Sequence, residues 1–194
     1  MGTDIHIVAE VFKDGRWHLA DIKPSDDRNY RAFAVLADVR NGYGFAGFDT
    51  GDPVIPISEP RGLPEDMSPE LRAKLERGND DESIDENGGD DEEEEWLWLG
   101  DHSFSWVTLR ELLDYDLDAP VTVRGYATKE AAKRYRETGE LPRAWAAWTP
   151  QPGYERIEWQ TPLRDSAPLI TTLIDEIKDL GEPEHVRLVF GFDS

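Results

Sequence analysis

The feature that most limits how this chain can fold is an acidic tract near its middle. Residues 80–95 carry eleven Asp or Glu side chains and no Lys or Arg. Carboxylates without counter-charges cannot enter a core, because each would lose its hydration without compensation. We therefore expect a flexible acidic insertion over residues 78–95, and the core has to come from the segments on either side of it.

The rest of the chain has the composition of one folded domain with an acidic surface. Of the 194 residues, 38% are hydrophobic and 10% aromatic, too many for a disordered chain. A chain of this length forms one domain, residues 1–194, that buries roughly 70% of its unfolded surface. The formal net charge is −21, with 42 acidic against 21 basic residues. Adaptation to high salt explains this excess of acid better than any binding partner does.

Three features favour an intracellular protein. Cysteine is absent, which excludes a disulfide framework and thiolate metal sites. No apolar stretch reaches the roughly 18 residues of a membrane-spanning helix, and the first residues lack the basic and apolar regions of a signal peptide. We expect a cytoplasmic protein without membrane contact. Repulsion between like charges disfavours direct binding to nucleic acid.

Alternating side chains predict strands at both ends of the chain. Residues 4–11 place apolar side chains at every second position, and Asp14-Gly15 forms a hairpin turn into residues 16–20. Residues 186–192 are rich in β-branched and aromatic side chains and predict another strand. The chain therefore begins with a β-hairpin and closes with a strand.

A helix and a long loop follow the predicted hairpin. Apolar residues from Tyr30 onward fall at helical spacing, with Asp26 or Asp27 as the expected cap and Asn41-Gly42 as the expected end. Residues 41–64 hold nine Gly or Pro residues, too many for a regular element. Long structured loops in compact domains are often functional.

Capping residues and periodicity predict the remaining elements. They are a helix from Ser68 to about Arg77, a helix after the capping box at Thr108 that ends near Tyr115, a strand over 121–126, a helix between Thr128 and Gly139, a strand over 154–160, and a helix over 169–180 capped by Asp165 or Ser166 and stopped by Gly181. Strands and helices do not alternate as βαβ units. We therefore predict a single α+β domain with a mainly antiparallel sheet, packed helices and long loops.

Asp4, His6 and His102 are the candidate catalytic and metal-binding residues. Asp4 and His6 leave the predicted strand on the same face, and a carboxylate beside an imidazole suits metal ligation or orientation of the histidine. His102 begins a short polar segment bracketed by tryptophans, a composition typical of a pocket wall. Mn²⁺, Zn²⁺ or Mg²⁺ is the metal we would expect. The alternative is that His6 is an ordinary half-buried strand residue.

Eight further residues are candidates for binding a ligand. They are Arg28, Asn29, Tyr30, Asn41, Arg61, Ser103, Ser105 and Trp106. Residues 28–30 stand at the front of a predicted helix, where backbone N–H groups also favour anions. Arg61 is held between two prolines, which lowers the entropy lost when its guanidinium binds a phosphate or carboxylate. The alternative is that Arg61 pairs with Glu59 or Glu65.

Several motifs occur along the chain in a characteristic order. They are MGTDIH at residues 1–6, RNY at 28–30, ADVRNG at 37–42, PISEPRGLP at 56–64, HSFSW at 102–106 and the closing strand to Asp193. This combination resembles a family of proteins encoded by tailed phages and by bacteria, many of them actinobacteria. Members usually have Cys where this chain has Thr3, and a second His where it has Phe104. The resemblance implies a phage-linked setting in the host cytoplasm, and with the composition a haloarchaeal virus or its host.

These observations give a functional hypothesis and a contrasting one. The first is a phage accessory protein with a site for an anionic, phosphorylated small molecule of the nucleotide type, which it either hydrolyses with the help of a metal or sequesters. The second is an acidic interaction protein that captures a basic partner, for example by imitating DNA, or a structural protein of the virion. The capture of a basic partner predicts binding that deletion of residues 80–95 abolishes.

Overall fold

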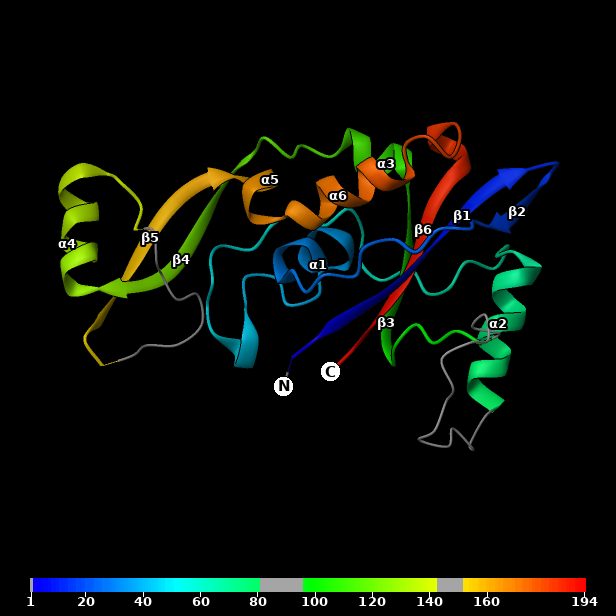
Figure 1. Ribbon diagram of the computed structural model, residues 1–194, viewed down its shortest axis with the longest axis horizontal. Helices are drawn as coiled ribbons and strands as arrows, with labels where there is room; N and C mark the ends of the chain where they lie inside the picture. Colours follow the sequence, from blue (N-terminus) through cyan, green and yellow to red (C-terminus); the bar gives the residue numbers. More distant parts are fainter. Residues whose placement is uncertain (1, 81–95, 143–151) are drawn as a thin grey trace.

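The computed structural model describes residues 2–80, 96–142 and 152–194 (Figure 1). Its helices and antiparallel sheets confirm the predicted α+β class. From Asp81 onward the predicted acidic insertion lies outside the described residues. No helix in the described part of the chain has both the length and the apolar character needed to cross a membrane.

A four-stranded antiparallel sheet with the order β2-β1-β6-β3 forms the centre of the protein. Its strands are β1 (Asp4–Lys13), β2 (Arg16–Leu19), β3 (His102–Thr108) and β6 (Val186–Asp193). The predicted hairpin and closing strand are confirmed. The strand β6 lies between β1 and β3. Because Asp4 pairs with Asp193, the first and last described residues lie near each other at the same end of these two central strands (Figure 1).

Three helices cover one face of this sheet and bury the main core. They are α1 (Tyr30–Ala37), α3 (Leu109–Asp114) and α6 (Pro168–Ile177). The period of two in β1 points Ile5, Ile7 and Ala9 toward these helices, and Leu188, Phe190 and Phe192 of β6 extend the same apolar layer. Burial of this layer is the main source of stability.

The other face of the sheet is covered by α2 (Pro69–Asp80) and neighbouring loops. It contains a buried ion pair between Arg187 and Glu10, at 2.7 Å. The Arg187 guanidinium also lies 3.9 Å from the centre of the Trp17 ring and bonds Asp66 at 2.8 Å. Removal of either partner would strongly destabilise the fold, because the remaining charge would be buried without compensation.

A second antiparallel pair forms an arm at one end of the elongated molecule (Figure 1). The arm consists of β4 (Pro120–Thr128), α4 (Lys129–Thr138) and β5 (Tyr154–Pro162). It has its own small core around Val123, Ile157 and Trp159. The one-turn helix α5 (Leu163–Ser166) leads from β5 to α6 and joins the arm to the body.

The predicted helix ends were partly wrong. Asn29 caps α1, because its side-chain oxygen accepts the Ala32 amide, whereas Asp26 and Asp27 do not. Asp38 ends α1 in the left-handed conformation, three residues before the predicted end at Asn41. The capping box at Thr108 and the boundaries of α4 are confirmed.

Two other helices also differ from the prediction. The helix α6 starts at Pro168 after Ala167, so neither Asp165 nor Ser166 caps it, and these two residues belong to α5. It ends at Ile177, before the predicted limit at residue 180. The helix α2 extends to Asp80, three residues past the prediction.

Candidate functional site

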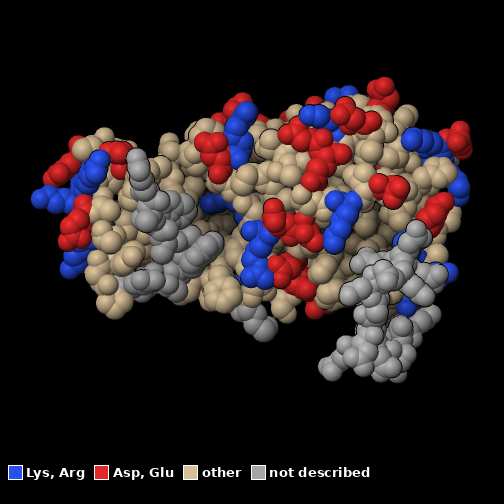
Figure 2. Space-filling view, in the orientation of Figure 1, with Lys and Arg blue, Asp and Glu red and all other residues tan. Residues whose placement is uncertain are grey.

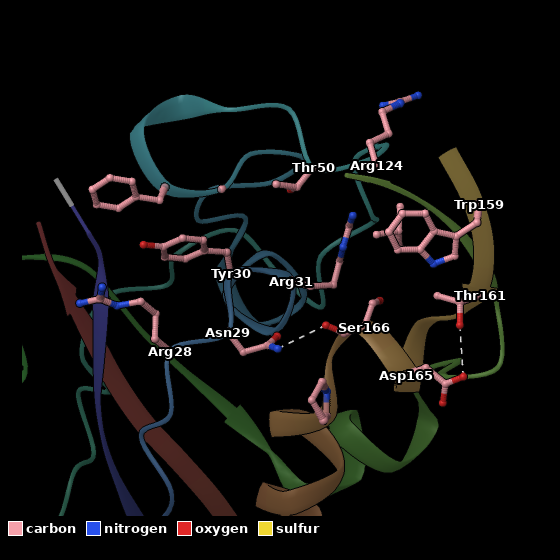
Figure 3. Close-up of a pocket in the computed structure, with 14 residues that line it drawn as sticks. Arg28, Asn29, Tyr30, Arg31, Thr50, Arg124, Trp159, Thr161, Asp165 and Ser166 are labelled. Carbon is pink, nitrogen blue, oxygen red and sulfur yellow. Dashed lines mark hydrogen bonds between the residues drawn. The ribbon is translucent and has the colours of Figure 1, made fainter. Parts of the chain in front are cut away.

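A cavity of about 660 Å³ lies where the arm meets the body, and we call it cavity 1. It is bordered by the N-terminus of α1, the loop 42–52, strands β4 and β5, and the α5–α6 junction (Figure 3). Figure 2 shows the molecule hollowed at this junction, with blue basic atoms inside the hollow. The predicted ligand residues Arg28, Asn29 and Tyr30 line cavity 1.

The wall formed by the loop 42–52 is fixed to the arm at close range. Gly51 pairs with Val123 of β4, and its Cα has no room for a side chain because a Cβ there would meet the Thr122 carbonyl oxygen at 2.1 Å. Its φ of +149° is also a conformation that favours glycine. Only glycine therefore allows the loop to lie against β4 at this point.

Arg124 of β4 connects the loop and the arm through three carboxylates. Its guanidinium bonds Glu158 of β5 at 2.7 Å, Asp49 of the loop at 3.2 Å, and Asp52 of the loop. These hydrogen bonds raise the pKa of Arg124, and the bond to Glu158 has the largest effect. Burial alone would raise the pKa of Asp49, but bonds from Arg156 and Arg124 outweigh it and the pKa is lowered. The Arg124 guanidinium therefore binds carboxylates of the protein itself and connects the loop 42–52 to the arm.

Arg31 of α1 is the cation in this cavity that has no carboxylate partner among the described residues. Its guanidinium donates to the Asp52 carbonyl at 2.5 Å and to the Thr122 carbonyl at 3.4 Å. A guanidinium has five N–H donors, so three are left for another group. Burial lowers the pKa of Arg31, and the positive charge of Arg124 lowers it further. The negative charge of Asp52 raises this pKa but does not outweigh them. An arginine nevertheless stays charged at any physiological pH.

The first turn of α1 adds backbone donors beside Arg31. Asn29 accepts the Ala32 amide at 2.7 Å and donates to the Ser166 carbonyl at 3.3 Å, which ties the helix start to α5. The amides of Tyr30 and Arg31, which come before Ala32 in the first turn, have no hydrogen-bond acceptor within the helix. They carry the positive end of the helix dipole, which favours an anion.

Apolar side chains form another part of the lining of cavity 1, beside the polar residues Thr50, Thr161, Asp165 and Ser166. Trp159 of β5, Val123 of β4, Phe45 of the loop and Pro168 of α6 contribute to its walls. Figure 3 shows the indole of Trp159 turned toward the side chain of Arg31. Phe45 remains 44% exposed, so it presents a ring at the cavity mouth. A flat apolar group has a surface to stack on within reach of the Arg31 charge.

A second cavity of about 460 Å³ lies beyond the C-terminal end of α1, and we call it cavity 2. The predicted residues His102 and Ser103 line it, together with Thr3, Arg40 and Ser194. His102 bonds Ser103 through Nδ1 at 3.0 Å and Ser194 through Nε2 at 3.0 Å. Several polar side chains that line cavity 2 therefore bond to one another.

Asp4 and His6 lie on one face of β1 as predicted, but each has a different partner. Arg28 donates two hydrogen bonds to Asp4, at 2.7 and 2.5 Å, and the first cause of the lowered Asp4 pKa is this bonding. His6 bonds Asp193 at 3.1 Å and packs against Trp98. In the described part of the chain, no three His, Cys, Asp or Glu side chains come together to hold a metal ion. The predicted metal site of Asp4, His6 and His102 is therefore not assembled from these side chains.

Arg61 pairs with a carboxylate that the sequence did not suggest. It bonds Glu111 at 3.1 and 2.6 Å, donates to the Trp106 carbonyl, and stacks on the Trp106 ring at 4.9 Å. Ser105 is buried and accepts the Arg61 amide at 3.2 Å. Arg61, Ser105 and Trp106 border neither cavity. Their contacts give them a structural role, and the prediction of an anion at Arg61 is not supported.

Asn41 also has a structural role. Its side chain donates to Asp38 at 2.6 Å and to the Val54 carbonyl at 2.7 Å, and it accepts the Val54 amide at 2.8 Å. These bonds fix the start of the long loop after α1. Asn41 borders neither cavity.

Arg31, Phe45, Arg124 and Trp159 are among the cavity residues that sequence reasoning missed. Arg31 directly follows the predicted anion motif at residues 28–30, and this position in the first helical turn was the available signal. Arg124 and Trp159 come from an arm whose contact with α1 is set by tertiary packing. Comparison with models of known protein families, with curated proteins and with solved structures gave no match.

Proposed function

We propose that this protein binds a small organic anion in cavity 1, a phosphate or carboxylate attached to a flat apolar group. In the phage-linked setting that the motif resemblance implies, the ligand is a phosphorylated compound of the nucleotide type and the protein sequesters it. Arg31 and the first turn of α1 hold the anion, and Trp159 and Phe45 contact the flat group.

The observation that carries this proposal is that Arg31, in an acidic protein, has no carboxylate within ion-pair distance among the described residues, although the charges of Asp52 and Asp49 act on it from further away. At least ten arginines lie within ion-pair distance of a carboxylate, namely Arg16, Arg28, Arg61, Arg110, Arg124, Arg134, Arg136, Arg156, Arg164 and Arg187. Arg31 bonds only backbone carbonyls within the described residues. Burial of a cation is unfavourable unless an anion compensates it, and a bound ligand supplies that anion.

The shape and lining of cavity 1 support the same ligand class. Its volume of about 660 Å³ falls within the roughly 300–1,000 Å³ of small-molecule sites. Such sites combine apolar and aromatic walls with polar groups that orient the ligand, and cavity 1 offers Phe45 and Trp159 together with Arg31. The ligand is therefore expected to combine one charged end with one flat apolar part.

Binding without turnover is the form of the function that the described side chains support best. Cavity 1 offers donors and stacking surfaces, and its Asp165 already accepts a hydrogen bond from Thr161 at 3.1 Å. The ligand's charge is met by a guanidinium that does not transfer protons at neutral pH. Product analysis on any ligand that binds will separate sequestration from hydrolysis.

A thermal-shift panel tests the proposal. It should contain nucleoside monophosphates, cyclic nucleotides and aryl carboxylates, each beside its uncharged nucleoside, alcohol or amide. The panel is run in molar KCl on the natural sequence, on Arg31→Gln and on Arg61→Gln. The second variant is the matched control, because Arg61 binds Glu111 away from both cavities.

The expected result is that charged members raise the melting temperature and their uncharged counterparts do so less. A ligand at 100 times its Kd stabilises the folded state by about 2.7 kcal/mol. Arg31→Gln should abolish this shift and Arg61→Gln should retain it. Equal shifts in all three proteins, or no shift with any anion, would refute the proposal.

A further inference from the structure

We propose that cavity 2 is a reactive site in which Ser103 is a nucleophile and His102 its general base, suited to hydrolysis of a small acyl ester. The proposal does not depend on cavity 1. It rests on four features of the described residues, namely a hydrogen bond, a fixed imidazole, local backbone strain and a cavity in front of the hydroxyl.

The first feature is the contact between the hydroxyl and the imidazole. Ser103 Oγ lies 3.0 Å from His102 Nδ1. A serine hydroxyl is a weak nucleophile until an adjacent base takes its proton, and hydrogen-bond distance is the requirement for that transfer. Both side chains border cavity 2, so an ester carbonyl can approach Oγ from the open side.

The second feature is that a third group orients the imidazole. His102 Nε2 lies 3.0 Å from Ser194 Oγ, and the ring stacks on Phe192 at 6.1 Å and 22°. In the tautomer that accepts the Ser103 proton at Nδ1, the Nε2–H donates to Ser194. Contact between nucleophile and base, with the base held by a third group, is the general pattern of an activated serine.

Hydrogen bonds continue from Ser194 to the far wall of the cavity. Ser194 Oγ lies 3.2 Å from Thr3 Oγ1, which also accepts from Arg40 Nε at 2.8 Å. Thr3 has two lone pairs, so it accepts from both Ser194 and Arg40 in the same arrangement. This direction of the bonds is compatible with the tautomer that the proposal needs, in which Nδ1 accepts from Ser103.

The third feature is strain at the nucleophile. Ser103 has a φ of +52° at the irregularity between His102 and Ser105 in β3. Of the five described non-glycine residues with positive φ, Asp38, Arg40 and Ser103 border cavity 2. Residues in such conformations cost about 1–3 kcal/mol each and cluster at functional sites. The Ser103 hydroxyl contacts His102 at this interruption of the regular strand.

The reaction follows from this geometry. Ser103 Oγ attacks the carbonyl carbon of the ester while its proton passes to His102 Nδ1. The C–O bond to the alcohol then breaks, and the leaving oxygen takes the proton from His102. Water attacks the acyl group on Ser103, gives its proton to His102, and releases the carboxylic acid as Ser103 regains its proton.

A fluorophosphonate probe tests the nucleophile directly, because it reacts with activated serines. Intact mass spectrometry should show one added phosphonyl group per chain, and peptide mapping should place it on Ser103. His102→Gln should slow labelling by about 100-fold, the smaller end of the usual effect of a general base. Ser105→Ala is the matched control, since Ser105 lies two residues away in β3 but outside the cavity.

A second variant separates lost chemistry from lost folding. Ser103→Gly removes the hydroxyl and also relieves the positive φ, so this variant should fold at least as well as the natural sequence and take up no label. No labelling, labelling at another serine, or labelling that persists in Ser103→Gly would overturn the proposal.

Discussion

The two ends of α1 border cavities that use their polar groups in opposite ways. At the N-terminal end, Arg31 lines cavity 1 beside apolar side chains such as Trp159 and bonds only backbone carbonyls within the described residues. At the C-terminal end, Thr3, His102, Ser103 and Ser194 bond to one another across cavity 2. Eight residues separate the ends, roughly 12 Å along a helix.

This difference distinguishes a binding site from a reactive one. Donors without partners in an apolar cavity gain most from a ligand that brings the missing acceptor. Side chains that already bond to one another gain little from a static ligand, but they are arranged to pass a proton. This difference is the reason that we propose ligand binding in cavity 1 and serine chemistry in cavity 2.

The largest effect is expected where the wall of cavity 1 meets the arm. Gly51→Ala places a Cβ 2.1 Å from the Thr122 carbonyl oxygen and 2.4 Å from Arg31, in a strained conformation. We expect a loss of about 3 kcal/mol or more in the free energy of unfolding, measured in urea. Cavity 1 should lose its ligand, while fluorophosphonate labelling in cavity 2 continues in whatever fraction stays folded.

Gly62→Ala is the control for this substitution. Gly62 also has a positive φ, +78°, but no atom lies within 4 Å of its added Cβ. Its loss should be about 1–2 kcal/mol, the cost of the left-handed conformation alone. Equal losses at both glycines would show that the close approach at Gly51 contributes nothing.

Removing the link between loop and arm should have the next largest effect. Arg124→Gln leaves Asp49, Asp52 and Glu158 without their shared cation. We expect a loss of about 1–3 kcal/mol in the free energy of unfolding, because this guanidinium is only 19% exposed. Hydrogen exchange should accelerate at residues 49–52. Arg134→Gln, which removes an exposed pair with Glu140, should cost less than about 0.5 kcal/mol.

Acid should loosen cavity 1 through the same carboxylates. The pKa values of Asp49 and Asp52 are lowered in the folded protein, so their contribution to stability is complete above the ordinary value of about 3.9. It is lost as the pH falls from there through the folded pKa values. Urea unfolding at pH 7 and pH 3 should show a smaller acid-induced loss in Arg124→Gln than in the natural sequence. Identical losses would mean that these carboxylates do not hold the wall.

The smallest effect is expected at the residue between the cavities. Tyr30 lines cavity 1, its hydroxyl accepts the Thr3 amide at 3.3 Å, and Arg40 of cavity 2 lies over its ring at 5.5 Å. Tyr30→Phe removes one hydrogen bond and should cost about 1 kcal/mol. Ligand affinity should fall by less than in Arg31→Gln. Loss of ligand binding and of Ser103 labelling together would show that the two ends of α1 act as one site.

Local sequence rules predicted most of the fold. Period-two alternation located β1 and β6, and the capping residues Thr108 and Thr128 located two helices, because these effects act over a few residues. The cap of α1 was misplaced because three candidate residues, Asp26, Asp27 and Asn29, lie within one turn. Only packing against α5, where Asn29 donates to Ser166, selects the last of them.

The candidate sites were less predictable because they depend on contacts between distant segments. Residues 28–30 and the pair His102-Ser103 were singled out, and they border cavities 1 and 2 respectively. Arg61 was favoured because two prolines hold its backbone, yet Glu111, 50 residues further on, binds it. The isolation of Arg31 depends on where every neighbouring carboxylate lies in three dimensions, and no local pattern encodes that.

The most direct test of the account is a calorimetric cycle that varies the ligand charge and Arg31 together. An anionic ligand from the thermal-shift panel and its uncharged counterpart are titrated into the natural sequence and into Arg31→Gln. We predict that the anion binds at least tenfold tighter to the natural sequence, a coupling of about 1.4 kcal/mol or more, and that this advantage disappears in Arg31→Gln. An advantage of the same size in both proteins would contradict the central claim that Arg31 receives the anion.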